Sequence, residues 1–264
     1  MYAFTYHRPT NLSAAVADLA AEDAKLLAGG QTLLPTMKQR LASPASVVDL
    51  GRISELSGIS REGEQIVIGA MTRHADVAGS AAVHQAIPAL ASLAAHIGDP
   101  HVRNRGTIGG SLANNDPAAD YPAAVLALGA TIVTNKREIA AAAFFKGLFE
   151  TALEAGEIIT KVRFPIPQKA AYQKFPNPAS RYALVGVFVA KTAAGVRVAV
   201  TGAGESGVFR ATALETALSG NFAAAALNGA KIPATGLNTD LHADAAYRAH
   251  LIVVLARRAV AAAG

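Results

Sequence analysis

The chain has 264 residues, 52% of them hydrophobic and only 16% charged, so it is long and apolar enough to fold around a full core. Its 24 basic and 19 acidic residues give a net charge of +5, but the basic residues are scattered without a basic and aromatic stripe, which argues against nucleic-acid binding. The absence of cysteine excludes disulfides, thiol nucleophiles and iron–sulfur ligation by this chain, so redox chemistry would need an organic cofactor or a partner.

The sequence carries no signal for a membrane or for export. No uncharged run reaches the roughly 18 residues of a membrane-spanning helix. The start, MYAFTYHRPT, lacks the basic and apolar regions of a secretory signal. We therefore expect a cytoplasmic protein without a membrane span, and the length favours two domains.

The first half of the chain predicts short strands mixed with helices. Thr10 and Asn11 are candidate caps of an amphipathic helix, in which Leu12, Val16 and Leu19 repeat at helical spacing. The expected helices cover 10–24, 33–41 and 86–98, and the expected strands cover 25–30, 46–50 and 65–70. The polar, glycine-rich stretch 105–123 follows, which we expect to be a loop without regular structure; such long loops are often functional.

After this loop, a short helix over 122–129 and strands over 130–134 and 157–165 are expected. Residues 168–180, with prolines at 176 and 178, are the best candidate for a domain boundary. Paired strands over 181–191 and 195–203 come next, followed by helices over 211–220 and 243–263. This irregular mixture of strands and helices indicates an α+β architecture, which we divide into domains of residues 1–176 and 177–264.

Three glycine clusters are candidates for a binding site. In the first, LAGGQTLL at 27–34, a strand runs into a glycine pair that can bring backbone N–H groups close to an anion; a plain tight turn is the alternative. The second, TIGGS at 107–111, continues to Asp116 and Asp120. A carboxylate repels phosphate, so these aspartates suit hydroxyl or ring N–H groups, unless they only cap the next helix.

The third cluster, GAGESG at 202–207, fits the pattern of a dinucleotide-binding fingerprint after a strand. The acidic residue expected about 20 positions later is missing, and too little chain remains for a nucleotide-binding sheet. We therefore predict a structural turn at 202–207, with an NAD(P)-binding protein as a rival interpretation.

Five segments resemble the FAD-binding medium subunit of molybdenum hydroxylases, the family of carbon monoxide dehydrogenase and xanthine dehydrogenase. They are AGGQTLLPTMK at 28–38, IGAMTRHADV at 68–77, RNRGTIGGSLANNDPAADYPA at 103–123, FFKGLFETALEAGEIITKVRFP at 144–165 and TGAGESGVFRATALE at 201–215. The resemblance implies a two-part FAD-binding domain of the PCMH type, followed by a smaller domain of antiparallel strands and helices.

The resemblance also implies cofactor-binding residues. The FAD pyrophosphate would be wrapped by Leu27, Ala28, Gly29, Gly30, Gln31, Thr32, Leu33 and Leu34. The opposite wall would consist of Thr107, Ile108, Gly109, Gly110 and Ser111. Asp120 would be a polar contact of FAD, the flavin pocket would include Ile97, Ile159 and Lys174, and Tyr182 matches an aromatic residue near the flavin ring.

The function implied by the resemblance is electron transfer. FAD held by this chain would collect electrons from 2Fe-2S clusters in a small partner subunit and pass them to an external acceptor. A large partner subunit would carry the molybdenum cofactor and the substrate site, in a dimer of heterotrimers. The chain itself would contribute no catalytic residue and no metal ligand. The alternative is that the chain is itself an enzyme, a stand-alone FAD oxidase of a small molecule, which would need an acid or base beside the flavin.

Overall fold

The computed structural model describes all 264 residues, and its first part is a small parallel sheet. Its strands are β1 (Thr5–His7), β2 (Ala24–Leu27) and β3 (Ser46–Asp49), in the order β1-β3-β2. Helices α1 (Leu12–Leu19) and α2 (Leu33–Lys38) and the 3-10 turns Leu50–Arg52 and Ser54–Leu56 accompany it. As predicted, Asn11 caps α1: its side-chain oxygen accepts from the N–H of Ala14 at 2.9 Å.

The second part is an antiparallel sheet in the order β4-β5-β10-β6-β7. Its strands are β4 (Ile59–Glu62), β5 (Gln65–Gly69), β6 (Thr131–Thr134), β7 (Glu138–Ala140) and β10 (Ile159–Pro165). The helices are α3 (His74–Gly79), α4 (Ala81–Ala86), α5 (Pro88–Ala95), α6 (Pro100–Arg103), α7 (Ile108–Asn114), α8 (Tyr121–Leu128) and α9 (Ala141–Phe144). A small hairpin, β8 (Phe145–Gly147) and β9 (Glu150–Thr151), follows α9.

The stretch 105–123 is not the irregular loop that the sequence suggested. It contains α7 and the start of α8. Glycine is a poor helix former, but tertiary contacts and the cap offset that cost here. The Thr107 hydroxyl oxygen accepts from the N–H of Gly110 at 3.2 Å, which begins the helix. At its other end, Asn115 takes the left-handed conformation, with φ of 44°.

The third part is an antiparallel sheet in the order β11-β12-β13-β14, which confirms the α+β class. It consists of β11 (Lys169–Pro176), β12 (Ala183–Thr192), β13 (Gly195–Thr201) and β14 (Phe209–Arg210), with helices α10 (Thr212–Gly220) and α11 (Ala245–Ala262) and the 3-10 turn Ala224–Leu227. Strand β11 runs through the stretch proposed as the domain boundary, so this sheet begins before residue 177.

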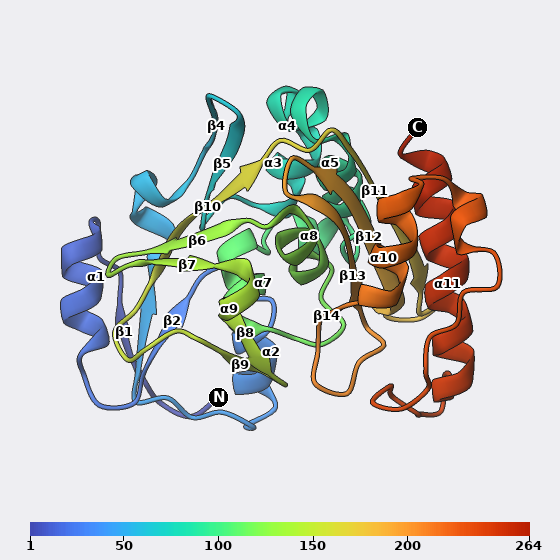
Figure 1. The fold of residues 1–264 in the computed structure, drawn as a ribbon. Helices are drawn as coiled ribbons and strands as arrows, with labels where there is room; N and C mark the ends of the chain where they lie inside the picture. The colour runs from blue at the N-terminus through green and yellow to red at the C-terminus, as the bar shows by residue number, and fades with distance from the viewer.

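Helix α8 lies between the second and third parts (Figure 1). All eight of its residues are buried, so it has no polar face, as is typical of a helix packed on every side. Helices α10 and α11 cover the other face of the third sheet (Figure 1). None of the helices combines the length and the apolar character that crossing a membrane requires.

Candidate functional site

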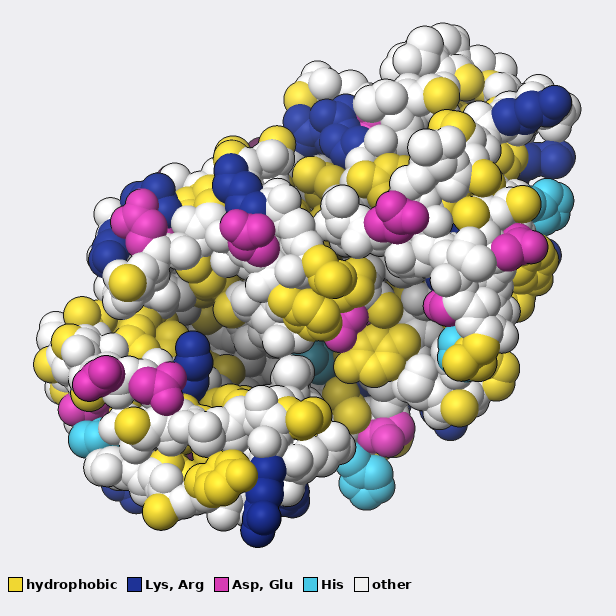
Figure 2. All heavy atoms as spheres, turned by 90° about the horizontal axis from the view of Figure 1, so that it is seen from below, with side chains coloured by type: hydrophobic (Ala, Val, Ile, Leu, Met, Phe, Trp, Pro, Cys, Tyr) yellow, Lys and Arg dark blue, Asp and Glu magenta, His cyan; other side chains and the backbone are white.

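A cavity of about 840 Å³ is lined by residues of the first and second parts and of the segment before β12. Its volume is within the range of ordinary small-molecule and cofactor sites. Figure 2, which views the molecule from below, shows a hollow with hydrophobic side chains beside it. The cavity is lined by all but four of the predicted cofactor-binding residues; the four exceptions are Leu27, Leu34, Ile108 and Lys174.

The first glycine turn joins β2 to α2 and offers free backbone donors to the cavity. The N–H groups of Gly29, Gly30, Gln31 and Thr32 have no hydrogen-bond partner within the chain, and all four residues line the cavity. Gly30 has a φ of 73°, which glycine adopts without strain. Successive unpaired N–H groups in such a turn form a concave binding site for an anion.

The second glycine turn differs, because the backbone N–H groups of Ile108 through Ser111 are used within the chain. Ile108 donates to the carbonyl of Thr72 at 3.1 Å, and Gly109 donates to that of Ala70 at 2.8 Å. A Cβ built on Gly109 would lie 2.6 Å from the Cβ of Ala70. The second turn is therefore a closely packed wall rather than a second set of free N–H donors, and the Ser111 hydroxyl remains unpaired on its cavity side.

The two turns touch each other at the cavity. A Cβ built on Gly29 would lie 2.3 Å from the carbonyl oxygen of Arg105 and 2.6 Å from the Cα of Gly106. Glycine at position 29 is thus required for the close approach of the two segments. The free N–H groups and this narrow contact fit the pyrophosphate of a dinucleotide such as FAD.

Asp120 joins a buried polar network at the end of the cavity. It accepts hydrogen bonds from the Tyr172 hydroxyl and from Lys174 Nζ, the latter at 3.0 Å, and Lys174 also donates to the carbonyl of His96 at 3.0 Å. Burial raises the pKa of the Asp120 carboxyl, and the Lys174 ammonium limits the rise. The network thus connects Lys174, which does not line the cavity, with Asp120, which does.

Tyr172 was not among the predicted residues, although the sequence holds a signal for it. It stands two positions before Lys174 on β11, and alternate residues of a strand face the same side. Burial raises its pKa well above the ordinary value, and Asp120 raises it further. Tyr172 therefore stays protonated and donates its hydrogen to Asp120.

The rim of the cavity carries Asp116 and Tyr182. One carboxylate oxygen of Asp116 accepts from the N–H of Ala118 at 2.8 Å, so Asp116 forms the turn before α8 while still lining the cavity. Asp120 makes no capping bond at the start of α8. Tyr182 is half exposed; burial raises its pKa, with Asp116 and Asp120 contributing in the same direction.

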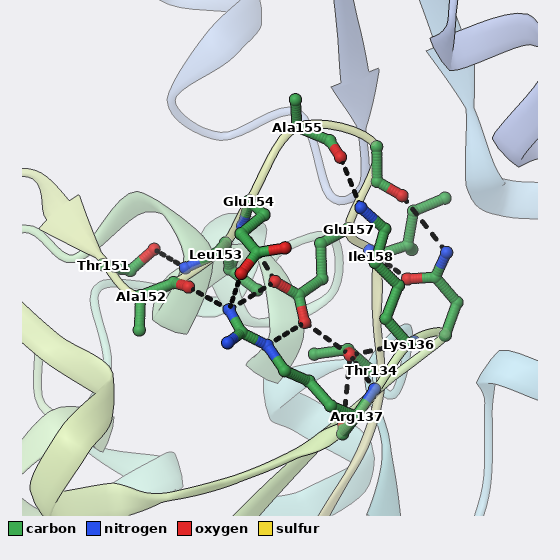
Figure 3. A network of polar contacts seen from close by, with 12 residues as sticks. Thr134, Lys136, Arg137, Thr151, Ala152, Leu153, Glu154, Ala155, Glu157 and Ile158 are labelled. Atoms are coloured by element: carbon green, nitrogen blue, oxygen red, sulfur yellow. Dashed lines mark hydrogen bonds and ion pairs between the residues drawn. The ribbon is translucent and has the colours of Figure 1, made fainter.

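The segment between β9 and β10 was also missed as a wall of the cavity, which Leu153, Glu157 and Ile158 line. An ion pair fixes it to the turn between β6 and β7 (Figure 3). Arg137 donates to both carboxylate oxygens of Glu157 at 3.0 Å, and the Thr134 hydroxyl donates to Glu157 at 2.7 Å. No local sequence motif marks this pairing, which joins residues 20 positions apart.

The third glycine cluster lies outside the cavity. The N–H of Gly202 donates to the carbonyl of Pro117 at 2.8 Å, and a Cβ on Gly202 would lie 2.3 Å from the carbonyl oxygen of Ala183. The cluster leads from β13 to β14 and then to α10. The prediction of a structural turn is confirmed, and the NAD(P)-binding interpretation loses its basis.

Comparison with known proteins identifies the family of the chain. Residues 2–167 match the protein family described as the FAD binding domain in molybdopterin dehydrogenase. The chain is 37% identical to the carbon monoxide dehydrogenase medium chain of Hydrogenophaga pseudoflava, over 98% of this chain and 96% of the relative. It is also 37% identical to the nicotine 6-hydroxylase medium subunit of Paenarthrobacter nicotinovorans, over 99% of this chain and 98% of the relative.

A solved structure has the same fold over the whole chain. Carbon monoxide dehydrogenase from Hydrogenophaga pseudoflava, in a form that lacks the Mo-pyranopterin moiety of the molybdenum cofactor, superposes with a TM-score of 0.89 at 38% identity. The match covers 99% of this chain and 97% of that chain, so it includes the third sheet and its helices as well as the first two parts.

Proposed function

Because the chain belongs to the family of FAD-binding medium subunits of molybdenum hydroxylases, we propose that it transfers electrons from the iron–sulfur clusters of a partner subunit, through FAD, to an external acceptor. The observation that carries the proposal is the cavity at which the two glycine turns meet, with free N–H groups from Gly29 through Thr32 on one side. FAD, when bound, supplies the exchange of electrons, and the chain supplies binding, orientation and the electrostatic surroundings.

The residues of the cavity have separate tasks in this proposal. The N–H groups of the first turn bind the pyrophosphate, and the second turn closes the opposite wall, with the Ser111 hydroxyl as a donor. The Asp120 carboxylate accepts from a hydroxyl or N–H group of the cofactor, held in place by Tyr172 and Lys174. Tyr182 stands at the rim, where an aromatic ring can stack on the flavin.

The partners of this proposal are a large subunit with the molybdenum cofactor and a small subunit with 2Fe-2S clusters, in a dimer of heterotrimers in the cytoplasm. The absence of cysteine supports a separate iron–sulfur subunit, because this chain has no thiolate with which to bind a cluster. Two relatives are named for carbon monoxide and for nicotine, both of them small molecules. In this proposal the large subunit likewise oxidises a small molecule.

The proposal is tested by anaerobic reduction of the flavin. The full chain is loaded with FAD and studied alone and in the complex purified with its partner subunits, and the flavin absorbance is followed after reduction of the iron–sulfur subunit. We expect bleaching in the complex, followed by recovery when an acceptor is added. A flavin that stays oxidised in the complex contradicts electron transfer. Turnover of a small molecule by the isolated chain would favour the stand-alone oxidase instead.

A further inference from the structure

His74 is a buried polar residue beside the glycine turns, and neither of its ring nitrogens has a hydrogen bond within the chain. It is the first residue of α3, it lines the cavity, and only 5% of it is exposed. Its backbone N–H donates to the carbonyl of Gly106 at 3.0 Å, and its neighbour Arg73 forms a β-bridge with Thr107. The backbone therefore fixes the imidazole next to the second glycine turn.

The two nitrogens of the imidazole have different surroundings. Nδ1 is fully enclosed and has no partner. Nε2 lies beside Gly106, since a Cβ built on Gly106 would stand 2.5 Å from it. Gly106 in turn contacts the first turn, because a Cβ on Gly29 would lie 2.6 Å from the Cα of Gly106. Nε2 is thus placed where the two turns meet.

The imidazole is uncharged near neutral pH. Burial lowers the pKa of His74 to about 4, and the positive charge of Arg103 acts in the same direction. The imidazole packs against the ring of Tyr121, with the two ring centroids 5.3 Å apart, and the Tyr121 hydroxyl is also buried without a partner. A neutral imidazole keeps one N–H donor, and leaving a buried donor unpaired costs free energy.

We propose that His74 is a further cofactor-binding residue, which donates a hydrogen bond from Nε2 to an oxygen atom of FAD where the two glycine turns meet. The inference rests on the proposed function, because it takes FAD as the ligand of the cavity. It explains how the second wall can bind the cofactor although the N–H groups of Ile108 and Gly109 are already bonded within the chain. It also gives a reason for glycine at 106, since a side chain there would occupy the place of the imidazole.

The test compares three variants of the full chain after removal of its flavin. His74→Phe keeps a ring but loses both nitrogens, His74→Gln keeps an N–H donor, and His250→Phe changes an exposed histidine on α11 as the matched control. FAD is titrated into each protein, and the quenching of flavin fluorescence gives the affinity. We expect His74→Phe to bind FAD about 10-fold more weakly or worse, His74→Gln to stay within about 3-fold of the wild type, and the control to be unchanged.

Several outcomes would overturn the inference. Equal affinity of His74→Phe and the wild type removes the role of His74, and equal weakening of His74→Gln and His74→Phe removes the role of the donor. Absence of FAD binding by the wild type contradicts the proposed function and the inference with it. Thermal unfolding of the flavin-free variants shows whether they fold. If His74→Phe does not fold, ¹⁵N NMR of the wild-type imidazole replaces it as the test. The inference requires that FAD shift the Nε2 resonance, and an unchanged resonance overturns it.

Discussion

At the scale of single residues, the glycines around the cavity serve two purposes. Gly30 has a positive φ and stands among N–H groups without partners, so it shapes the first turn. Gly109 has no room for a side chain, because a Cβ there would lie 2.6 Å from the Cβ and 2.7 Å from the carbonyl oxygen of Ala70. Substitution at 109 should therefore move α7 away from β5 and open the second wall.

We predict that Gly109→Ala destabilises the flavin-free chain by about 1–3 kcal/mol, the usual range for an overpacked core. The amount of FAD that the variant retains should fall together with its stability, because the second wall of the cavity moves. Flavin absorbance after gel filtration and urea unfolding measure the two effects. Gly79→Ala is the matched control, since a Cβ at Gly79 meets nothing within 4 Å. Equal behaviour of the two variants would contradict the packing argument.

Asp120 and Lys174 form the most deeply buried ion pair of the fold, with side-chain exposures of 4% and 5%. Removing one charge of such a pair leaves the other without compensation in a medium that solvates it poorly. Arg61 and Glu64 form an exposed pair, with side-chain exposures of 50% and 86%. Water solvates each of these charges, so removing one of them costs little.

We predict that Asp120→Asn lowers the free energy of unfolding by about 3–5 kcal/mol, because it leaves the Lys174 ammonium buried and unpaired. The variant Asp120→Asn with Lys174→Met should recover part of this loss. Glu64→Gln, as the control, should cost less than about 1 kcal/mol. Urea unfolding at neutral pH measures all three. A loss for Asp120→Asn no larger than that of the control would show that Lys174 finds another partner.

At the scale of elements, the Arg137 and Glu157 pair fixes the segment between β9 and β10, which forms one wall of the cavity (Figure 3). The Arg137 guanidinium, together with hydrogen bonds from Glu154 N–H and the Thr134 hydroxyl, lowers the pKa of Glu157 from 4.5 to about 2. A carboxyl whose pKa is lower in the folded state stabilises the fold above its unfolded pKa, and this contribution is lost as the pH falls through the folded pKa.

We predict that the wild type is more stable than Glu157→Gln by about 2–3 kcal/mol at pH 6, and that this difference shrinks steadily between pH 4.5 and about pH 2. Unfolding in urea at a series of pH values measures it. Glu154→Gln, which removes a carboxylate that is 60% exposed and bonded to the same arginine, should cost less than about 1 kcal/mol. A difference that does not change with pH would contradict the assignment to Glu157.

Most of the longer elements could be predicted from the sequence, because their apolar periodicity is local; α1, α5, β12 and β13 are examples. Helix α7 was missed because its glycines disfavour a helix, and the packing of Gly109 on Ala70 that offsets this is a contact between distant segments. Strand β11 was missed because the prolines suggested a domain boundary; it is an edge strand, and an edge tolerates proline at its end.

The candidate site was predictable to the extent that it lies on motifs. The glycine turns and Asp120 stand in recognisable segments, and nearly all of these residues line the cavity. The roles of His74, Tyr172 and Glu157 depend on burial and on partners far away in the sequence, which local patterns do not contain.

At the scale of the whole molecule, the third part completes the site. Residue Lys174 of β11 reaches Asp120, and the Thr201 hydroxyl of β13 donates to the carbonyls of Pro117 and Ala119 at 3.1 and 2.6 Å. Phe188 of β12 belongs to the same hydrophobic core as the second sheet. Such a shared core couples the parts when the protein unfolds.

We therefore predict one cooperative thermal transition for the full chain, with the same midpoint by far-ultraviolet circular dichroism and by flavin fluorescence. A fragment of residues 1–168 should lose the FAD affinity of the full chain, because it lacks Tyr172 and Lys174. Two separate transitions, or full affinity in the fragment, would contradict the coupling.

The most direct test of the account is the stoichiometry and place of FAD binding in the full chain. Calorimetric titration of the flavin-free protein should give one FAD per chain. Gly29→Ala should abolish this binding, because its Cβ would lie 2.3 Å from the carbonyl oxygen of Arg105 and push the two turns apart. Gly220→Ala, where a Cβ meets nothing within 4 Å, should bind as the wild type does. A wild-type chain that binds no FAD, or a Gly29→Ala variant that binds it fully, would contradict the account.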